Sequence, residues 1–268
     1  MTNITLTDHE FSQFQRFIFD AAGISMSEGK KALVSGRLAK RLAHWRVSSY
    51  SAYLQLLAGG GEPAEVQMAV DLLTTNETYF FRESKHFDLL RELALAARAR
   101  NAPLRVWSAA CSTGEEVYSM AMVLADVLED RPWEVLGTDI SARVLARAQR
   151  GHYPMERASQ MPAHYLKRFC LKGQGSEAGT LLIERSLRAR VQFAHANLNT
   201  ALPQLGAFDV IFLRNVMIYF NGDTKRQVVA RVLAQLKPGG HFCIGHSETL
   251  NDISTAVRAL APSIYVKA

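Results

Sequence analysis

Val106–Glu116 reads VWSAACSTGEE, an apolar run that passes through small residues, reaches one glycine and ends in two adjacent acids. The apolar residues suit a buried strand, and the acids suit the first turn of a helix. Further along the chain, apolar runs alternate with segments of helical periodicity. Because such alternation builds a mostly parallel sheet with helices on both faces, we expect the stretch to begin an α/β domain.

The same patterns place the other elements of this domain. The expected strands are 104–110, 133–140, 191–196, 208–215, 241–247 and 263–268, and the expected helices are 85–100, 116–128, 141–149 and 222–236. LKPGGHF, at 236–242, predicts a helix end and a turn. The alternation is interrupted between 151 and 190. There, a short helix at 162–169 and glycine-separated runs at about 170–190 predict a small antiparallel β insert.

The N-terminal part has helical patterns throughout. TDHE, at Thr7–Glu10, fits a capping box, Gly23 fits a helix end, and Pro63 fits the first residue of a later helix. A helix expected over 27–46 carries basic residues and no acid from Lys30 onward. We therefore expect a helical domain at 1–82, with one basic helix, and a second domain at 83–268 that contains the β insert.

The amino-acid composition indicates the class of protein. The chain has 268 residues, of which 48% are hydrophobic and 21% charged, and its net charge is +6. No apolar run approaches the roughly 20 residues that cross a bilayer, and the first residues do not resemble a signal peptide, so we expect a cytoplasmic protein. Its three cysteines, Cys111, Cys170 and Cys243, are odd in number and far apart, so we expect reduced thiols and no metal.

The loop before the helix at 116–128 indicates the kind of ligand. It reads AACSTG rather than G-x-G-x-x-G, and Glu115 and Glu116 would lie where a dinucleotide diphosphate needs free amide groups. Carboxylates at this place favour a cation such as S-adenosylmethionine, which has a sulfonium, an ammonium group and no phosphate. The alternative is that both acids are solvated and only complement the helix dipole.

Asp139 ends the next expected strand. An acid at this position can accept hydrogen bonds from both ribose hydroxyls of a bound adenosine. The alternative is that Asp139 caps the following helix, although Ser141 can also cap it.

These motifs together resemble the CheR family of bacterial chemotaxis receptor methyltransferases. The matching segments come in family order and cover essentially the whole chain: TTNETYFFRE, RVWSAACSTGEE, GTDIS, NLN, FDVIFLRNVMIYF, LKPGG and GHSE. The resemblance implies a class I methyltransferase: a Rossmann-like, mostly parallel seven-stranded sheet with an all-α N-terminal domain and a small antiparallel β insert. It also implies S-adenosyl-L-methionine as cofactor, S-adenosyl-L-homocysteine as product, and glutamate side chains of chemoreceptors as substrates of a protein-glutamate O-methyltransferase.

The resemblance further implies roles for residues at matching positions. Arg82 and Tyr219 would lie beside the transferred methyl group; for Tyr219, the alternative is a core aromatic. The basic helix would bind the receptor's cytoplasmic domain through Lys30, Arg37, Lys40 and Arg41. The cofactor contacts would be Asn76, Thr78, Arg82, Glu115, Asp139, Asn197, Leu198, Arg214 and Asn215.

Two positions depart from the family pattern. Cys111 stands where alanine is usual, and Ala43 stands where some members have another arginine on the basic helix. The chemistry agrees with the resemblance, because a glutamate with a pKa near ~4.3 is ionised at neutral pH and can attack a sulfonium methyl without a general base. The chain also lacks the N-P-P-Y motif of amine methylation and the Pro-Cys nucleophile of cytosine methylation.

Two other functions stay open. The basic helix could bind the phosphates of a nucleic acid in a nucleic-acid methyltransferase, and the chain could be a catalytically silent scaffold in a signalling complex. Against these, we expect a monomer that binds chemoreceptors, does not bind nucleic acid and does not insert into a membrane. The β insert could also capture a peptide from the receptor's C-terminus by pairing with a strand edge.

Overall fold

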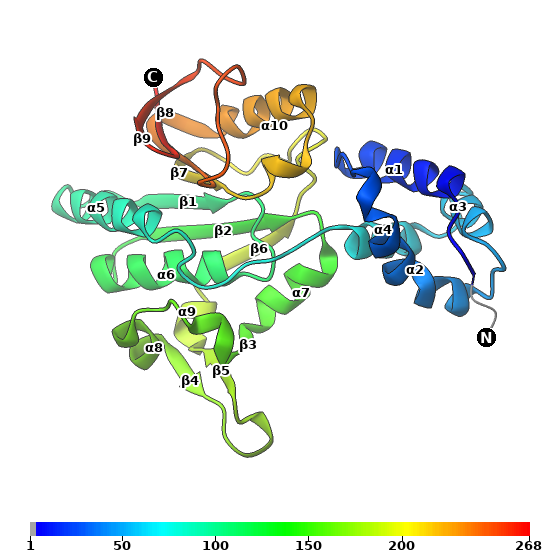
Figure 1. Cartoon of the computed structure of the whole chain (residues 1–268). Helices are drawn as coiled ribbons and strands as arrows, with labels where there is room; N and C mark the ends of the chain where they lie inside the picture. Colours follow the sequence, from blue (N-terminus) through cyan, green and yellow to red (C-terminus); the bar gives the residue numbers. More distant parts are fainter. Residues whose placement is uncertain (1–3) are drawn as a thin grey trace. The chain divides into compact units, whose positions relative to one another are not determined.

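The computed structural model describes residues 4–268, which form two compact units (Figure 1). Unit 1 contains the described residues up to Thr75 together with Tyr219–Thr224, and unit 2 contains Asn76–Ile218 and Lys225–Ala268. The boundary at Thr75 comes before Arg82, where the sequence placed it. The reason is that 76–83 bonds to the second unit: the Asn76 carbonyl accepts from Ser112 Oγ at 2.8 Å.

Unit 1 is a helical domain. Its first helix has the predicted capping box at Thr7 and Glu10, and ends at Gly23, whose φ is 72°. Phe14, Ile18 and other apolar side chains of these helices are buried in its core. The helices are α1 (Asp8–Ala22), the 3-10 turn η1 (Glu28–Lys30), α2 (Lys31–Trp45), α3 (Tyr50–Ala58) and α4 (Pro63–Leu73).

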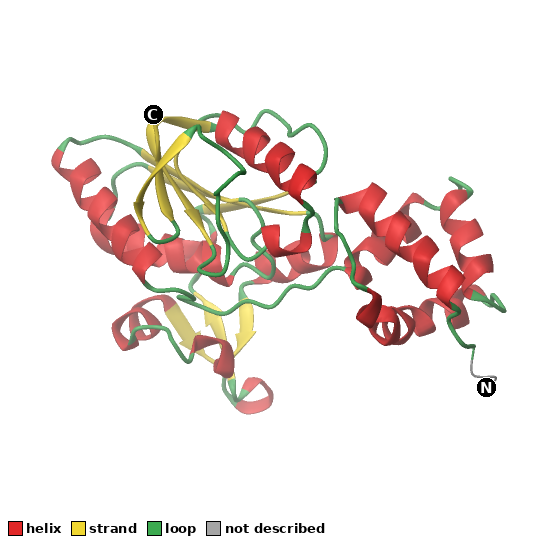
Figure 2. Cartoon of the chain, turned by 45° about the horizontal axis from the view of Figure 1, so that its top comes forward, coloured by secondary structure: helices red, strands yellow, loops and turns green. Residues whose placement is uncertain are grey.

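Unit 2 is built on a seven-stranded sheet (Figure 2). The strand order is β6-β2-β1-β7-β8-β10-β9; the first five strands are parallel, and β10 is antiparallel to both of its neighbours. Because the chain winds outward in both directions from β1, β1 and β7 flank the switch point where ligands bind in such sheets. The strands are β1 (Leu104–Ser108), β2 (Trp133–Asp139), β6 (Val191–His195), β7 (Phe208–Leu213), β8 (Leu236–Ile244), β9 (Val257–Ala261) and β10 (Ile264–Lys267).

Helices cover both faces of this sheet. In Figure 1, α5 (Lys85–Ala99), α6 (Glu115–Leu128) and α7 (Ala142–Arg150) lie on one side of the strands, and α10 (Gly222–Ala234) lies on the other. Strand residues such as Val106 and Phe212 are fully buried between these layers. The class I methyltransferase fold expected from the sequence is therefore confirmed. No helix among the described residues has the length and apolar character of a membrane span.

Two details of the sheet differ from the expected elements. β9 was not predicted, because four of its five residues are exposed and the strand lacks an apolar alternation. LKPGG forms the start of β8 rather than a turn. Gly239, with a φ of 71°, and a register shift between Phe208 and Val210 accommodate this irregular start.

The β insert forms its own three-stranded antiparallel sheet in the order β3-β5-β4. It begins earlier than the expected 170–190, and Glu184–Arg190 is not extended, because Arg185–Arg188 turn into a short helix. Leu181 and Ile183 of the central strand are fully buried. The elements are β3 (His152–Pro154), η2 (Met155–Ala158), α8 (Ala163–Phe169), β4 (Cys170–Lys172), η3 (Gly175–Glu177), β5 (Thr180–Ile183) and α9 (Arg185–Arg188).

Candidate cofactor and methyl-transfer site

The loop between β1 and α6 lies at the carboxyl edge of the sheet. Gly114 precedes α6 with a φ of 93°, and a Cβ at this position would lie 2.7 Å from the Cβ of Ala148 in α7. Both the conformation and the close approach therefore require glycine. The Ser112 N–H donates to Asp139 Oδ2 at 2.8 Å, which holds the loop against the end of β2.

Asp139 is the last residue of β2 and is 7% exposed. Its Oδ1 accepts from the Ser141 N–H at 2.9 Å. Ser141 is the residue that caps α7, because its Oγ accepts from the Val144 N–H at 3.4 Å. The helix-cap interpretation therefore applies to Ser141, and the Asp139 carboxylate contacts the loop of the candidate site.

Glu115 and Glu116 are not solvated acids at a helix end. Glu115 is 1% exposed, and its Oε2 accepts from Thr113 Oγ1 at 2.6 Å. Burial raises the pKa of the Glu115 carboxyl above its ordinary value. Glu116 accepts from Ser108 Oγ at 2.7 Å and forms an ion pair with Arg214 at 2.6 Å. The two adjacent acids thus have different partners, and both lie inside the fold.

The segment 76–83 is held along the same loop by backbone groups. Besides the bond from Ser112 to the Asn76 carbonyl, the Phe81 N–H donates to Ser119 Oγ of α6 at 3.0 Å. The Thr78 carbonyl accepts from the Arg157 guanidinium. These bonds place Asn76 beside the loop that follows β1 and Thr78 beside Arg157 of η2; both residues were predicted cofactor contacts.

Asn197 and Leu198 follow the neighbouring strand, β6. The Ala196 N–H donates to the Asp139 carbonyl at 3.0 Å, so this turn lies next to the end of β2. Asn197 Oδ1 accepts from the Asn199 N–H at 2.9 Å, and the Leu198 side chain is 8% exposed. A polar and an apolar residue therefore lie in the turn next to Asp139, and their contact with adenine stays a prediction.

Arg214 follows β7, and its side chain is only 2% exposed. Its guanidinium donates to Glu83 Oε2 at 3.0 Å and to Glu116 Oε2 at 2.6 Å, and it also donates to the Arg82 carbonyl. By joining two carboxylates to the backbone of Arg82, Arg214 has an internal role that the sequence did not predict. Its direct contact with cofactor stays a prediction.

Asn215 lies in a left-handed conformation, with a φ of 55°. Glu248, from the GHSE motif, holds the backbone here: its Oε2 accepts from the N–H groups of Asn215 at 2.9 Å and Gly245 at 2.7 Å. Burial raises the pKa of Glu248 above its ordinary value, although these backbone bonds oppose the rise. Glu83 and Glu248 lie in two of the motifs that carry the family resemblance, but the sequence pattern alone indicates no role for either residue.

The predicted catalytic residues belong to different units. Arg82 is in unit 2, where its Nη1 donates to the Glu77 carbonyl at 3.1 Å and its guanidinium lies 5.8 Å from the Tyr79 ring centroid. Tyr219 is in unit 1, where its carbonyl accepts from the Ser25 N–H at 2.7 Å. Each is partly buried. Their joint action on one methyl group stays a prediction.

Of the four predicted substrate contacts, Lys30 ends η1 and the other three lie on α2, and two of these have structural partners. Arg37 donates to the carbonyls of Leu73 at 3.2 Å and Thr74 at 3.0 Å, where α4 ends. Arg41 forms an ion pair with Glu65 of α4. Lys30 and Lys40, in contrast, are exposed.

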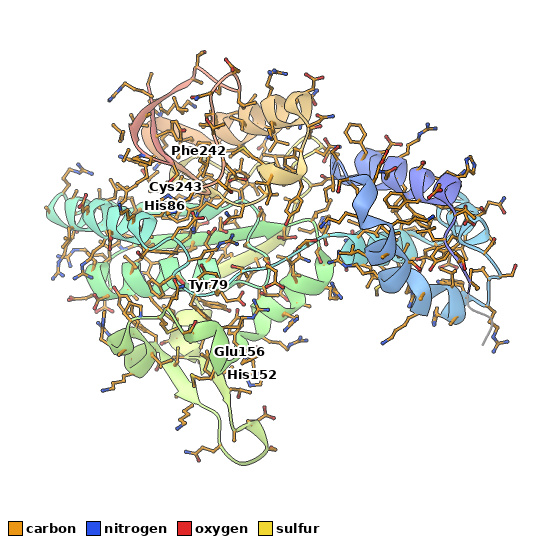
Figure 3. All side chains as sticks on the ribbon, in the orientation of Figure 1. Tyr79, His86, His152, Glu156, Phe242 and Cys243 are labelled. Carbon is orange, nitrogen blue, oxygen red and sulfur yellow. The ribbon has the colours of Figure 1, made fainter. Side chains whose placement is uncertain are left out.

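A hollow of about 480 Å³ lies beside the segment 76–83. Thr78, Tyr79, Glu156 and Arg157 are among the residues that line it, and Figure 3 labels Tyr79 and Glu156. The lining includes two acids, Glu77 and Glu156, and one cation, Arg157. It is thus a polar hollow next to a predicted cofactor contact.

Glu83, His86 and His246 place potential metal-ligand atoms within 4.8 Å of one another (His86 is labelled in Figure 3). However, both Glu83 oxygens already accept hydrogen bonds, including those from the Arg214 guanidinium. A metal ion at this position would lie beside a fixed positive charge. The arrangement therefore favours the arginine over a metal as the cation of this cluster.

The donors at the carboxyl edge fit S-adenosylmethionine better than a dinucleotide. The Ser112 N–H, which a phosphate would need, already donates to the Asp139 carboxylate. Glu115 adds another buried acid nearby. A diphosphate would be repelled by these groups, whereas a sulfonium and an ammonium group would be attracted.

Comparison with known proteins gives the same result. The family description "CheR methyltransferase, SAM binding domain" matches residues 76–266, and "CheR methyltransferase, all-alpha domain" matches residues 9–74. Chemotaxis protein methyltransferase 2 of Pseudomonas aeruginosa is 43% identical over 262 residues, which cover 97% of this chain and 93% of that protein. The chemotaxis protein methyltransferase of Escherichia coli is 38% identical over 267 residues, with 98% and 92% covered.

Among solved structures, the N-methyltransferase NodS from Bradyrhizobium japonicum in complex with S-adenosyl-L-homocysteine is similar to part of the chain. The similarity has a TM-score of 0.40 and 12% sequence identity, and covers 69% of this chain and 87% of NodS.

Proposed function

The chain belongs to the CheR methyltransferase family, and on this basis we propose that it methylates glutamate side chains of chemoreceptors. It is a methyltransferase that uses S-adenosylmethionine, and its relatives act in chemotaxis. The observation that carries the proposal is the acidic carboxyl edge of the sheet, in which Asp139 and Glu115 are buried beside a loop whose Ser112 N–H already donates to Asp139. This edge suits a cationic methyl donor.

The proposed acceptor needs little catalytic help. When bound, S-adenosylmethionine supplies a methyl group on a positively charged sulfur, and an ionised glutamate is already a nucleophile. The protein's task is then to orient the carboxylate and exclude water. We assign the orientation to Arg82 and Tyr219, whose guanidinium and hydroxyl groups can donate hydrogen bonds to a carboxylate.

We assign the cofactor contacts by group. Asp139 binds the ribose hydroxyls, Asn197 and Leu198 flank the adenine, and Glu115 binds the methionine part. The neighbouring loops close the site with Asn76, Thr78 and Asn215. Arg214 acts through the residues to which it donates hydrogen bonds. Support comes from the bonds that gather the ends of β1, β2 and β6 around one loop.

We place the reaction in the cytoplasm. Cys111, Cys170 and Cys243 are all free thiols, as expected for a reducing compartment. Exposed Lys30, at the end of η1, and exposed Lys40, on α2, would contact the receptor's acidic helices. Because Arg37 and Arg41 hold unit 1 together, we give them no primary part in this contact.

The β insert offers a second receptor contact. β4 lies at the edge of the small sheet, and its Leu171 is 56% exposed beside exposed Lys172. An extended peptide from a receptor's C-terminus can pair with such an edge, which would raise the enzyme's concentration near its substrates. Of the arginines nearby, Arg185 is exposed, whereas Arg188 and Arg190 donate to backbone carbonyls. Peptide titration of the wild-type chain and a Leu171→Asp variant tests this contact, and equal affinities would contradict it.

The nature of the product tests the main proposal. The chain is incubated with labelled S-adenosylmethionine and purified cytoplasmic fragments of chemoreceptors from its source cell. A glutamate methyl ester should release the label as volatile methanol in mild alkali, and peptide mapping should locate it on glutamate. Label that stays on the substrate after alkali would contradict a carboxyl ester and favour N-methylation.

A further inference from the structure

Glu83 has no assigned role, yet its carboxylate joins three parts of the site. Its Oε2 accepts from Arg214 Nη2 at 3.0 Å, after β7. Its Oε1 accepts from Asn215 Nδ2 at 3.3 Å and from the His246 N–H at 3.2 Å, after β8. The side chain is 12% exposed, so solvent screens these contacts only weakly. Glu83 thus fastens its own segment to the ends of two neighbouring strands.

Arg214 extends this network. Its Nη1 donates to Glu116 of α6, and its Nη2 also donates to the carbonyl of Arg82. The guanidinium therefore donates to two carboxylates and to the backbone of Arg82, a predicted catalytic residue. Removing one carboxylate would leave a buried positive charge with fewer acceptors, so Arg214 and the groups it holds would move.

The backbone on both sides of the network adopts unusual conformations. Phe81 and Glu83 have φ values of 57° and 58°, and Asn215 has a φ of 55°. Residues other than glycine rarely occupy this left-handed region, and they persist there only where surrounding bonds fix them. The Glu83 carboxylate supplies such bonds to its own turn and to Asn215.

We propose that Glu83 is a positioning residue for methyl transfer: through Arg214 and Asn215 it fixes the backbone of Arg82 and the loop that follows β7. This inference rests on the proposed function, in which Arg82 and Asn215 contact the acceptor and the cofactor. We assign Glu83 no direct contact with either, because both of its oxygens accept from protein donors. Its loss should therefore act on geometry, which lowers kcat and cofactor affinity and leaves the binding of a receptor to other surfaces intact.

The variant Glu83→Gln tests the proposal with little change in shape. An amide has one acceptor oxygen where the carboxylate has two, so either Arg214 or the Asn215 and His246 donors lose a partner. The matched control is Glu134→Gln. Glu134 also makes a two-point ion pair with an arginine, Arg105, with contacts of 2.7 and 3.1 Å, but at the amino ends of β1 and β2.

Kinetics and calorimetry are measured on both variants, on Glu83→Asp and on the wild type. We expect Glu83→Gln to lower kcat by about 100-fold, since small misplacements at a reacting centre have effects of this order. Its S-adenosylmethionine Kd should rise about 10-fold, because Asn215 loses its support. The KM for the receptor fragment should stay within about 3-fold, since remote receptor contacts remain. Glu83→Asp should recover part of kcat, and Glu134→Gln should keep wild-type values.

The outcomes separate this inference from the proposed function. If Glu83→Gln keeps wild-type kcat and Kd, or if Glu134→Gln loses as much of both, Glu83 is not a positioning residue. If the wild type methylates no receptor fragment, the proposed function fails, and the Kd comparison alone decides the inference. A raised Kd in Glu83→Gln only would then support the positioning role, and equal Kd values would overturn it.

Discussion

Two buried arginine clusters in this chain have similar chemistry and different consequences. In unit 1, Arg41 pairs with Glu65, which also accepts from the Tyr53 hydroxyl, and the cluster joins α2, α3 and α4. In unit 2, Arg214 pairs with Glu83 and Glu116 at the carboxyl edge of the sheet. The first cluster contacts only groups that maintain helix packing, whereas the second contacts the backbone of Arg82.

Both arginines were predicted to contact a ligand or substrate, and both form ion pairs with carboxylates of their own unit. Arg41 lies on the helix with the most basic sequence, yet its partner is internal. Arg214 follows β7 at the carboxyl edge of the sheet, where it joins two carboxylates to the backbone of Arg82. The position of the partners therefore decides the role, and mutations in the two clusters should affect different measurements.

The largest effect should come from unit 1. Glu65→Ala leaves the partly buried Arg41 guanidinium without its carboxylate and removes the acceptor of Tyr53, so the free energy of unfolding should fall by about 3–5 kcal/mol. Urea denaturation followed by circular dichroism measures this loss. The folded fraction should bind S-adenosylmethionine with unchanged affinity, because none of these groups lies in unit 2.

Asp8→Ala is the control for this variant. Asp8 pairs with Lys31 at 2.6 Å, but its side chain is 96% exposed, so the loss of this ion pair should be barely measurable. A Glu65→Ala protein as stable as Asp8→Ala would show that the Arg41 cluster does not hold the helices together. Lower cofactor affinity in folded Glu65→Ala would remove the contrast between the two clusters.

The next effect concerns the cofactor alone. Asp139→Asn keeps the shape of the side chain but removes the charge that we expect to bind two ribose hydroxyls. The affinity for S-adenosylmethionine should fall by about 1–3 kcal/mol, as for lost hydrogen bonds to a charged group. Calorimetry measures it. Ser141→Ala is the control, because it removes the cap of α7 and should lower stability by about 1 kcal/mol without changing affinity.

Equal affinities in wild-type and folded Asp139→Asn proteins would mean that Asp139 only organises the loop through Ser112. That result would remove the main support for a cofactor site beside the Asp139 carboxylate. It would not affect the role of the Arg41 cluster, which the stability measurement tests separately.

The sequence predicted the parts of this molecule that depend on local pattern. Parallel topology alone brings Asp139 and Glu115 to one edge, since Asp139 is the last residue of β2 and Glu115 begins the helix after the loop that follows β1. The partners of Arg41 and Arg214 could not be predicted in this way. Periodicity shows that Arg41 is on a polar face, but its partner is 24 residues away, and Glu83 is 131 residues from Arg214. Only the packed structure shows which charges are paired.

The third prediction uses pH to test the Glu83 side of the comparison. His86 is fully buried next to Arg214 and Glu83, and burial, together with the Arg214 charge, lowers its pKa from 6.5 to about 3. Below pH ~6.5, His86 binds a proton in the unfolded chain but stays neutral in the folded chain. Acid therefore favours the unfolded chain, and the free energy of unfolding falls progressively from pH ~6.5 toward pH 3. At pH 5.5 the loss should be about 1.4 kcal/mol.

Urea denaturation at pH 7.5 and 5.5 measures this difference. The titratable and charged groups around His86 include Glu83, Arg214 and His246. His86→Gln, which cannot gain a proton, should lose less stability between the two pH values than the wild type does. If the variant has the same pH dependence as the wild type, His86 is protonated in the folded protein at pH 5.5. Burial and the Arg214 charge would then not keep its imidazole neutral.

The smallest effect should come from two exposed lysines, Lys30 at the end of η1 and Lys40 on α2. Lys30 and Lys40 are exposed, so Lys30→Glu with Lys40→Glu should leave stability nearly unchanged. If these lysines meet an acidic receptor helix, reversal should raise the KM for the receptor fragment by about 2- to 5-fold and reduce its salt dependence. The control is the pair Arg100→Glu and Arg258→Glu, which makes the same change in net charge at exposed positions of unit 2. An equal rise in KM for both pairs would reflect net charge rather than a contact made by these lysines, and a rise in cofactor Kd for the lysine pair would contradict the division between the two units.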